Sequence, residues 1–572
     1  MADEDERKGG SSTDVSSPIM ADEDERKGGS STDGEAAFVE RVRASRHACR
    51  AGRLYMWGLA LGGLPLPGTA VDSAGDCAFP ARVVIPKVRE SPREPRFVRV
   101  AADLTVFAAL DEAGRVWAWG KERSGLPTQP TPFALPRVDD AVAVDCSVGA
   151  SFVVAASASG RAYALGKLPF AARSSRGAPR SKGIVGGKAS CSEWVEMRRC
   201  TSERGGSTEA DSAANDMADP IVQVEACGDT VVATTLSGKV WSAGSAFTNG
   251  LGRQQNRMTS LAHVSAFGAT RILTVALGSL HAAAIDEHGV VWVWGDGLSG
   301  QLGVGKRCRL VATPTPLPLS SHGGVRAVEV GCTRGQPSPR RQGTKPGKMR
   351  PGQEGPRMHV VVEDGRLFVA GATHKGLGGD HLSKTFTPDH DLLTLYHVGG
   401  PAADVAVAKH GGKVPIPCPT GGAEELALGN TDVAEWSLGL PATDPPCAGL
   451  GSGGRTNYLS GVRIIASQPS HIHSLALSDD GRVFTWGCGT NGRTGLAAFL
   501  RGPGGSKRRL KCYVSSPTAV ESLRGMAVVF ATSGKYWTLA IIQDRAADRA
   551  DRADRADRVA EASVRGKTST QK

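Results

Sequence analysis

The sequence predicts an all-β protein, a seven-bladed β-propeller built from four-stranded antiparallel blades. Three observations predict it. Glycine is abundant, with 73 of 572 residues, which favours a protein rich in turns. A short glycine- and aromatic-containing motif recurs seven times along the chain. Two apolar strands follow the last copy of the motif, and the first copy lacks the two strands that should precede it.

The repeated motif is the heptapeptide Gly-x-x-aromatic-x-x-Gly, and seven of the ten tryptophans lie in its copies. An apolar run ending in Asp or Ser precedes most copies, as in Phe107-Ala-Ala-Leu-Asp-Glu-Ala-Gly114. This pattern predicts a strand, a tight turn and a second strand, with the aromatic side chains packed between blades. The motif glycines are Gly52, Gly58, Gly114, Gly120, Gly160, Gly166, Gly238, Gly244, Gly289, Gly295, Gly365, Gly371, Gly481 and Gly487.

Further strands complete each unit in the order A, B, C and D. An apolar strand precedes each pair, as at 272–276, and a proline-containing strand follows some pairs, as at 313–319. Proline is tolerated at a sheet edge, so strand D should be outermost. One such sheet cannot bury both of its faces, but a ring of sheets can.

The chain ends predict how the ring closes. The copy at 52–58 has no clear strands A and B before it, and the apolar strands near 527–531 and 536–542 have no heptapeptide after them. We therefore expect the C-terminal strands to complete the N-terminal blade. The propeller should span residues 38–543.

Outside the ring the composition changes. Residues 1–37 form an acidic tail in which MADEDERKGGSSTD occurs twice, which fits either a second start at Met20 or a duplication in the gene model. The tail should be disordered because it has little apolar content. Residues 544–572 carry an Asp-Arg-Ala repeat, which fits either a short exposed helix or a solvated tail.

Four insertions are predicted at 167–218, 333–357, 411–456 and 501–511. Their net charges are +3, +6, −3 and +5, which sum to the +11 of the whole chain. We expect 333–357 and 411–456 between strands A and B, and the other two after strand C, so that all four decorate one face. The segment 411–456 also fits an unspliced intron.

The heptapeptides and their surroundings resemble the regulator of chromosome condensation repeat family. The best copy runs from Gly278-Ser-Leu-His281 through Trp294-Gly295 to Gly300-Gln301-Leu302-Gly303. The resemblance covers about 52–543 and implies a seven-bladed propeller that serves as an interaction platform. The founding member is a nuclear exchange factor for the small GTPase Ran and docks on nucleosomes. No segment here matches its exchange-factor loops, so the resemblance supplies no catalytic residue, and the acidic tail differs from its basic one.

The sequence carries no phosphate-binding loop, zinc-protease motif or nucleophile elbow. His281 and His473 occupy a repeat position that holds Val106, Phe152 and Thr230 elsewhere, so we interpret both as structural residues. We predict no catalytic residue, no metal site and no cofactor.

The predicted function is a non-enzymatic protein-interaction scaffold with a basic loop face for an acidic partner, and the alternative is a nucleotide exchange factor for a Ran-type GTPase. Protein partners are expected, and nucleic acid or chromatin is a further candidate. The alternative interpretation is that the basic segments are solvated loop insertions with no binding role. No membrane span or secretion signal is apparent, so we expect an intracellular monomer in the cytoplasm or nucleus. The predicted contact residues are Arg340, Arg341, Lys345, Lys348, Lys507, Arg508, Arg509 and Lys511.

Overall fold

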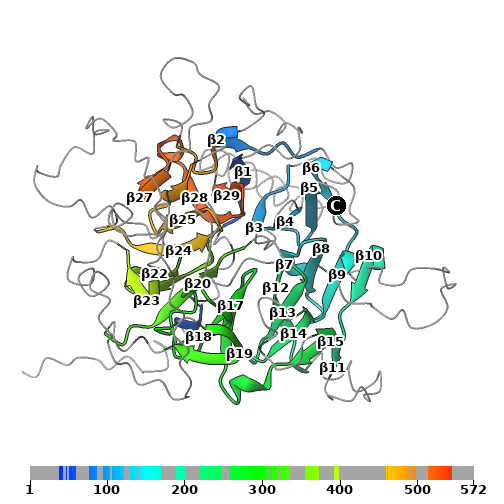
Figure 1. Ribbon diagram of the computed structural model, residues 1–572. Coiled ribbons are helices and arrows are strands. Elements are labelled where there is room, and N and C mark those ends of the chain that lie inside the picture. The colour runs from blue at the N-terminus through cyan, green and yellow to red at the C-terminus, as the bar shows by residue number, and fades with distance from the viewer. Residues whose placement is uncertain are drawn as a thin grey trace, which may run out of the picture.

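The computed structural model is a ring of seven antiparallel sheets, as Figure 1 shows. Around the ring, each sheet runs from an inner strand A to an outer strand D. The structure describes residues 38–40, 42, 47, 50–58, 77–86, 94–103, 106–120, 129–138, 142–168, 189–200, 218–245, 252, 257–306, 308–317, 319, 323–334, 355–372, 392–398, 459, 461–489, 492–496 and 513–543. The two predicted tails and most of the predicted insertions lie outside these ranges.

The blades follow the chain in order. Blade 1 comprises β3 (Phe97–Ala102), β4 (Val106–Asp111), β5 (Val116–Gly120) and β6 (Gln129–Ala134). Blade 2 comprises β7 (Ala143–Val148), β8 (Phe152–Ser157), β9 (Ala162–Leu168) and β10 (Ala189–Glu196). Blade 3 comprises β12 (Ile221–Cys227), β13 (Thr230–Thr235), β14 (Val240–Ser245) and β15 (Arg257–His263), with β11 (Arg199–Cys200) added in parallel to its outer edge.

The second half of the ring repeats this plan. Blade 4 comprises β16 (Ile272–Leu277), β17 (His281–Asp286), β18 (Val291–Gly297) and β19 (Cys308–Leu317). Blade 5 comprises β20 (Ala327–Cys332), β21 (Arg357–Val362), β22 (Leu367–Gly371) and β23 (Leu392–His397). Blade 6 comprises β24 (Ile464–Pro469), β25 (His473–Ser478), β26 (Val483–Cys488) and β27 (Tyr513–Ala519).

The closing blade joins the two ends of the propeller. It contains β28 (Ala527–Ser533), β29 (Trp537–Gln543), β1 (Arg53–Gly58) and β2 (Cys77–Arg82). Strand β1 pairs with β29 without interruption, from Arg53 opposite Ile542 to Gly58 opposite Trp537. This confirms the predicted closure by N- and C-terminal strands.

The core lies between blades. In the cluster that joins the closing blade to blade 1, Phe107 of β4 packs against Trp537 of β29 with ring centroids 4.3 Å apart. The tryptophan that precedes the last motif glycine is fully buried in four copies, at Trp57, Trp119, Trp294 and Trp486. Two heptapeptide aromatics also fix the B–C turn, because the indole N–H groups of Trp117 and Trp292 donate to Asp111 and Asp286.

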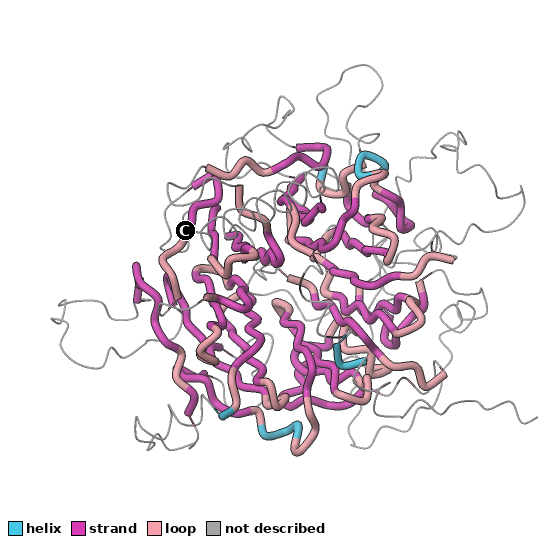
Figure 2. Tube along the Cα trace, turned by 180° about the vertical axis from the view of Figure 1, so that it is seen from behind, coloured by secondary structure: helices cyan, strands magenta, loops and turns pink. Residues whose placement is uncertain are grey.

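Two short 3-10 turns, η1 (Ser265–Phe267) and η7 (Glu521–Leu523), follow strand D of blades 3 and 6. Figure 2 shows the ring from behind, with strands throughout and little helix. Within the described ranges, no helix has the length and apolar character that crossing a bilayer would require.

The strand order defines two faces. The AB/CD face is where the A–B and C–D connections emerge, and the BC/DA face is where the B–C and D–A connections emerge. Residues 333–357 join β20 to β21 and residues 501–511 lie between β26 and β27, so both connections belong to the AB/CD face, as predicted.

Two insertion assignments need correction. The segment 411–456 lies between β23 and β24, a D–A connection, so it belongs to the BC/DA face and not with the others. The range 167–218 contains β10 and β11, so it is two connections and not one. Residues 169–188 join strands C and D of blade 2, and residues 201–217 lead from β11 toward β12 on the opposite face.

The last glycine of three heptapeptides, Gly58, Gly244 and Gly371, is explained by the close approach of strand B to strand C. Gly58 has φ +123°, and a Cβ there would lie 2.4 Å from the backbone oxygen of Tyr536. We expect Gly58→Ala to lower the free energy of unfolding by about 3 kcal/mol, since both the backbone conformation and the contact become strained. Urea denaturation measures this change in the free energy of unfolding.

Gly525→Ala is the matched control. Gly525 also has a positive φ, +81°, but a Cβ there would meet no atom within 4 Å. Only the conformational cost of about 1 kcal/mol should remain. Equal losses for the two variants would contradict the close-packing explanation.

Candidate functional site

The central channel of the propeller is lined by the inner strands and contains buried charges. Sequence reasoning overlooked them, although charged residues inside otherwise apolar strands are an available signal. Arg99 lies in β3, Asp145 in β7 and Glu225 in β12, and all three are at most 6% exposed. A buried charge has to be paired, so these side chains had to meet across the channel wall.

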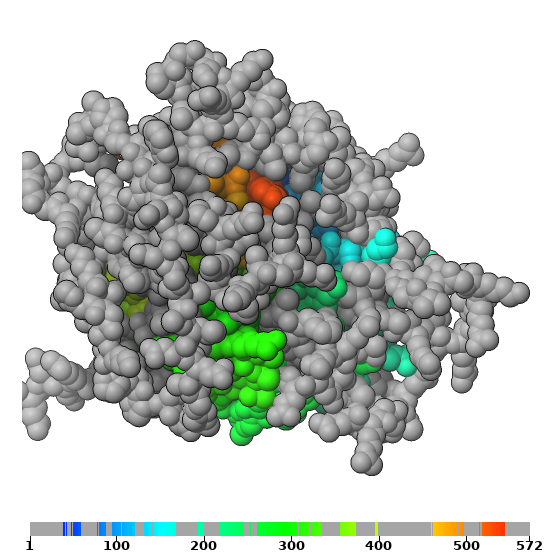
Figure 3. Space-filling view, in the orientation of Figure 1, coloured from blue at the N-terminus to red at the C-terminus, as the bar shows by residue number. Residues whose placement is uncertain are grey.

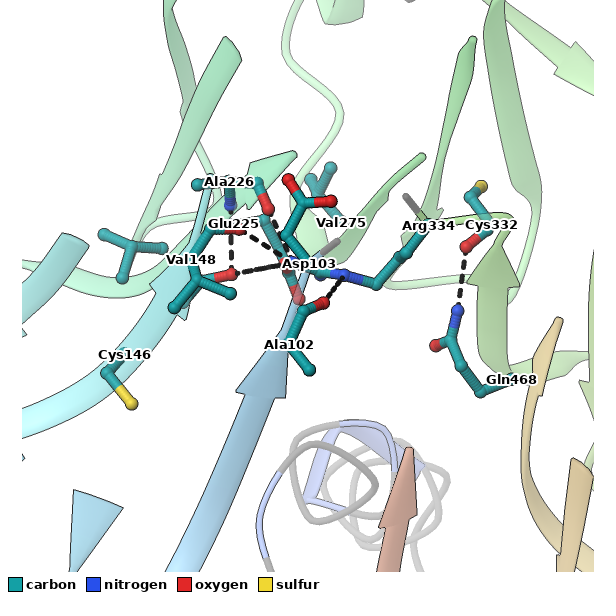
Figure 4. Close-up of polar contacts among 12 residues, drawn as sticks. Ala102, Asp103, Cys146, Val148, Glu225, Ala226, Val275, Cys332, Arg334 and Gln468 are labelled. Atoms are coloured by element: carbon teal, nitrogen blue, oxygen red, sulfur yellow. Dashed lines mark hydrogen bonds and ion pairs between the residues drawn. The ribbon is translucent and has the colours of Figure 1, made fainter. Parts of the chain in front are cut away.

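Arg334 joins this group from the far side of the ring (Figure 4). It follows β20 of blade 5, and its Nη1 lies 2.7 Å from Glu225 Oε2 of blade 3. Its Nε donates to the Ala102 carbonyl at 3.1 Å, and its Nη2 donates to the carbonyls of Ala226 and Val148 at 2.6 and 3.1 Å. One side chain thus connects blade 5 to blades 1, 2 and 3 at the AB/CD end of the channel.

The ion pairs continue along the channel wall. The second carboxylate oxygen of Glu225 accepts from Arg99 Nη2 at 2.9 Å, and Arg99 Nε lies 3.3 Å from Asp145 Oδ1. His47 Nε2 lies 3.4 Å from the same Asp145 oxygen. These contacts therefore run from Arg334 to His47, which precedes the first strand of the propeller.

Each buried charge in this group is stable only while its oppositely charged partner is present. Burial alone would lower the pKa of Arg334, but the negative charge of Glu225 raises it above its usual value. The Arg334 guanidinium therefore stays charged. Because Glu225 is bound by two arginines and by the Ser147 hydroxyl, its carboxylate is held as a structural ion and not poised as a base.

The space left in the channel is small. The cavity beside Arg334 has a volume of about 60 Å³ and is lined by Arg99, Glu225, Thr274, Glu329 and Gln468, among others. Small-molecule sites usually have volumes of roughly 300–1,000 Å³. Among the described residues, no group of three or more His, Cys, Asp or Glu side chains is placed to hold a metal ion.

A second set of buried residues lies at the first position of strand B, and four of its seven members are polar. Val106, Phe152, Thr230, His281, Arg357, His473 and Trp537 occupy this position in the seven blades. His473 forms hydrogen bonds with Thr538 Oγ1 of the next blade and with Ser470 Oγ, both at 2.9 Å, as expected of a structural residue. Arg357 donates to the His473 carbonyl at 3.1 Å.

These buried histidines stay neutral. Burial lowers the pKa of His281 to about 3, with His471 contributing, and burial with the nearby Arg357 charge holds the pKa of His359 and His473 well below the usual value. Burial also lowers the pKa of Arg357, to about 9.

The predicted contact residues Arg340, Arg341, Lys345, Lys348, Lys507, Arg508, Arg509 and Lys511 all lie outside the described residues. The structure does describe the two ends of the connection that contains Arg340, Arg341, Lys345 and Lys348. Arg334 and Arg357, which were counted as part of this basic insertion, are both buried. The remaining connection, 335–354, carries five basic residues and one acidic residue.

Comparison with known proteins agrees with this architecture. Models of the regulator of chromosome condensation repeat match residues 272–301, 288–334 and 480–541. The chain contains regulator of chromosome condensation repeats. These matches cover blade 4, the start of blade 5, and the segment from blade 6 into the closing blade.

Curated relatives are similar over part of their length. The chain is 26% identical over 283 residues to the ultraviolet-B receptor UVR8 of Arabidopsis thaliana, which is 47% of this chain and 54% of the receptor. It is 26% identical over 338 residues to the human E3 ubiquitin-protein ligase HERC2, which is 56% of this chain and 6% of the ligase. The chain thus matches about half of one relative and a small part of the other.

Among solved structures, Prp20p of Saccharomyces cerevisiae has the same fold. The TM-score is 0.56 at 16% identity, and the match covers 91% of this chain and 98% of that one. That structure was described together with the binding of Prp20p to Gsp1p and histones. At this identity the similarity establishes the propeller fold alone.

The Arg334 bridge is tested by removing its charge. We expect Arg334→Met to lower the free energy of unfolding by about 3–5 kcal/mol, since Glu225 then loses a buried partner. Arg366→Met in the same blade is the control, because Arg366 pairs with Asp364 at the exposed surface and should contribute less than about 1 kcal/mol. Similar losses in chemical denaturation would contradict a bridging role.

The neutral histidines predict a pH dependence. In the unfolded chain they bind protons near pH 6.5, whereas in the folded chain they stay neutral to much lower pH. Stability should therefore be complete above about pH 7 and fall below 6.5 by about 1.4 kcal/mol per pH unit for each histidine. His281→Val introduces valine, the residue that blade 1 has at this position. This variant should lose less stability per pH unit, by about 1.4 kcal/mol, which is the contribution of one proton. An unchanged slope in urea titrations from pH 7 to 5 would contradict it.

Proposed function

We propose that this propeller is a non-enzymatic protein-interaction scaffold whose AB/CD face contacts an acidic partner. The observation that carries the proposal is the distribution of charge between the two faces. The strand order assigns each long connection to a face, and the sequence gives the charge of each connection.

Three long connections of the AB/CD face are basic, whereas residues 59–76 and 373–391, which join strands C and D of the closing blade and of blade 5, carry net charges of −2 and −1. Residues 169–188 of blade 2 carry five basic and no acidic residues, residues 335–354 of blade 5 carry five basic and one acidic residue, and residues 501–511 of blade 6 carry five basic and no acidic residues. Three blades thus contribute positive charge to one side of the ring.

The long connections of the BC/DA face have the opposite sign. Residues 201–217 carry one basic and four acidic residues, and residues 411–456 carry two basic and five acidic residues. The sequence prediction placed all four insertions on one face, whereas the strand order separates the connections 201–217 and 411–456 from the three basic ones. A protein with one basic face and one acidic side attracts and orients an acidic partner before contact.

The ring supports a scaffold more than an enzyme. The buried carboxylates of the channel are engaged with arginines, and the channel cavity is small. A closed ring also has no unpaired blade, so no second copy is needed to complete the fold, and we propose a monomer. We place this role in the cytoplasm or nucleus, supported by the scattered cysteines and the lack of any Cys-x-x-Cys pair. Figure 3 shows described residues of blade 4 (green) at the molecular surface, where a partner can reach them.

A charge-neutralised variant tests the basic face. Replacing Arg340, Arg341, Lys345, Lys348, Lys507, Arg508, Arg509 and Lys511 with glutamine should weaken binding to a glutamate-rich peptide or to a duplex of about 20 base pairs by about tenfold or more at low salt. It should also make the salt dependence shallower. Fluorescence anisotropy measures binding to both probes, and the probe that binds more tightly indicates the partner class.

The control neutralises the other side. Glu424, Glu425, Asp432 and Glu435 replaced by their amides should leave binding unchanged or slightly stronger. If the two variants bind alike, the charge distribution does not determine partner contact and the proposal is wrong.

A second candidate is nucleotide exchange on a Ran-type GTPase. Two observations favour it, the fold similarity to Prp20p, described with its Gsp1p binding, and the acidic 411–456 connection on the side opposite the basic face. Exchange needs no bond chemistry, only stabilisation of the nucleotide-free GTPase.

The measurement is release of a fluorescent GDP analogue from Ran with catalytic amounts of the full chain. Acceleration by orders of magnitude would establish exchange activity and make the scaffold role secondary. The scaffold function predicts no acceleration from folded protein.

A further inference from the structure

Each inner strand begins with the same irregularity. The register with strand B shifts between the first and third residues in six of the A strands and between the second and fourth residues in β28, so that one residue of each A strand is left unpaired. Such bulges are built features of a sheet and redirect side chains. The unpaired residue is aliphatic in every blade: Val98, Val144, Val222, Leu273, Val328, Ile465 and Val529.

These residues surround one mouth of the channel. The next residue of several A strands, for example Arg99, Thr274 and Glu329, lines the channel cavity. Because A strands start on the BC/DA side, the seven aliphatic residues form a rim at that end, which we call the aliphatic rim. Val144, Val222 and Ile465 are 37–38% exposed. Apolar residues gathered at an exposed mouth are typical of an interaction site.

Two rim residues are covered by the chain itself. Leu273 and Val328 are 7% and 5% exposed, and they belong to one apolar cluster with Phe38 and Val42. Residues 38–40 and 42 are helical, so Phe38 and Val42, four apart, lie on one side of the same turn. Figure 1 shows this turn in dark blue beside β18 and β20.

The position of Phe38 is fixed by contacts on the BC/DA face. The guanidinium carbon of Arg326, just before β20, lies 3.4 Å from the centre of the Phe38 ring. A Cβ on Gly289, in the B–C turn of blade 4, would lie 3.1 Å from Phe38 Cζ. Phe38 and Val42 are themselves 3% and 0% exposed.

Farther along the N-terminal region, the chain contacts blade 2. His47 lies beside Asp145, whose neighbour Val144 is an exposed rim residue. The described residues of the N-terminal region therefore contact blades 4, 5 and 2, and they cover only part of the rim. The remaining rim positions stay accessible to some degree.

We propose that the aliphatic rim is a docking site for an apolar helical turn, and that the turn carrying Phe38 and Val42 is its resident, exchangeable occupant. The turn that carries Phe38 and Val42 belongs to none of the seven sheets, and an element outside the strand ladders opens more easily than the blades. Tethering supplies it at an effective concentration in the millimolar range, so a weak contact suffices to fill the site. This site lies on the side opposite the basic face and does not depend on the proposed function.

The test uses the full chain and a labelled peptide of residues 34–47. In the natural chain the tethered segment competes with the peptide. In the variant Phe38→Ala/Val42→Ala the rim is vacated, and we expect the peptide to bind about tenfold or more tightly. Glu40→Gln is the matched control, because it removes only the charge of a third residue on the same turn, nearly preserves the shape of that side chain, and retains Phe38 and Val42.

Fluorescence anisotropy measures binding, and thermal unfolding verifies that each variant is folded. A peptide that carries the same two alanines should not bind any of the proteins. Absence of peptide binding to the folded double variant would overturn the proposal. Equal binding to the natural chain, the Glu40 control and the double variant would overturn it as well.

Discussion

The pairing of β1 with β29 is the contact on which the rest of the structure depends. Six consecutive residue pairs, from Arg53 opposite Ile542 to Gly58 opposite Trp537, join segments from opposite ends of the propeller. The other six blades are each made from consecutive strands, so they need only local pairing. Without the closing blade, blades 1 and 6 would each expose an apolar face, because a blade buries its faces only against its neighbours. Closure also carries the largest loop entropy in the chain, and forming it should limit the folding rate.

A closed ring leaves a channel, and this chain fills it with polar contacts. Arg334 reaches from blade 5 to blades 1, 2 and 3, and the ion pairs continue through Arg99 to Asp145. The charges compensate one another, so they tie the blades together at the cost of desolvation. At the other mouth the N-terminal segment packs Phe38 and Val42 on the aliphatic rim. The turn therefore fills only part of this mouth, because Val144, Val222 and Ile465 of the rim remain exposed.

The sequence predicted the features that depend on local pattern. The motif glycines and the alternation after them identified strand C in every blade, and the prolines at 313–319 identified an outer strand, β19. Strands with weak local signals were missed. Ile464–Pro469 contains Ser, Gln and Pro, so strand A of blade 6 was not recognised and 411–456 was assigned to the wrong face. Strand β10 was likewise hidden within a basic and glycine-rich range.

The channel contacts could not be predicted, because their partners meet only when the ring closes. Arg334 and Glu225 are 109 residues apart in sequence, and Arg99 and Glu225 are 126 apart. Spacing along the chain carries no signal for such pairs. A charged residue within an apolar inner strand does predict that a buried partner exists, but it does not identify the partner.

The central claim is that partners meet the AB/CD face while the BC/DA mouth remains separate. Hydrogen exchange of the full chain, with and without a saturating glutamate-rich peptide, tests this most directly. We predict slower exchange in the A–B and C–D connections of blades 2, 5 and 6, and unchanged exchange at the B–C turns. Protection concentrated at the B–C turns, with none on the AB/CD face, would contradict it.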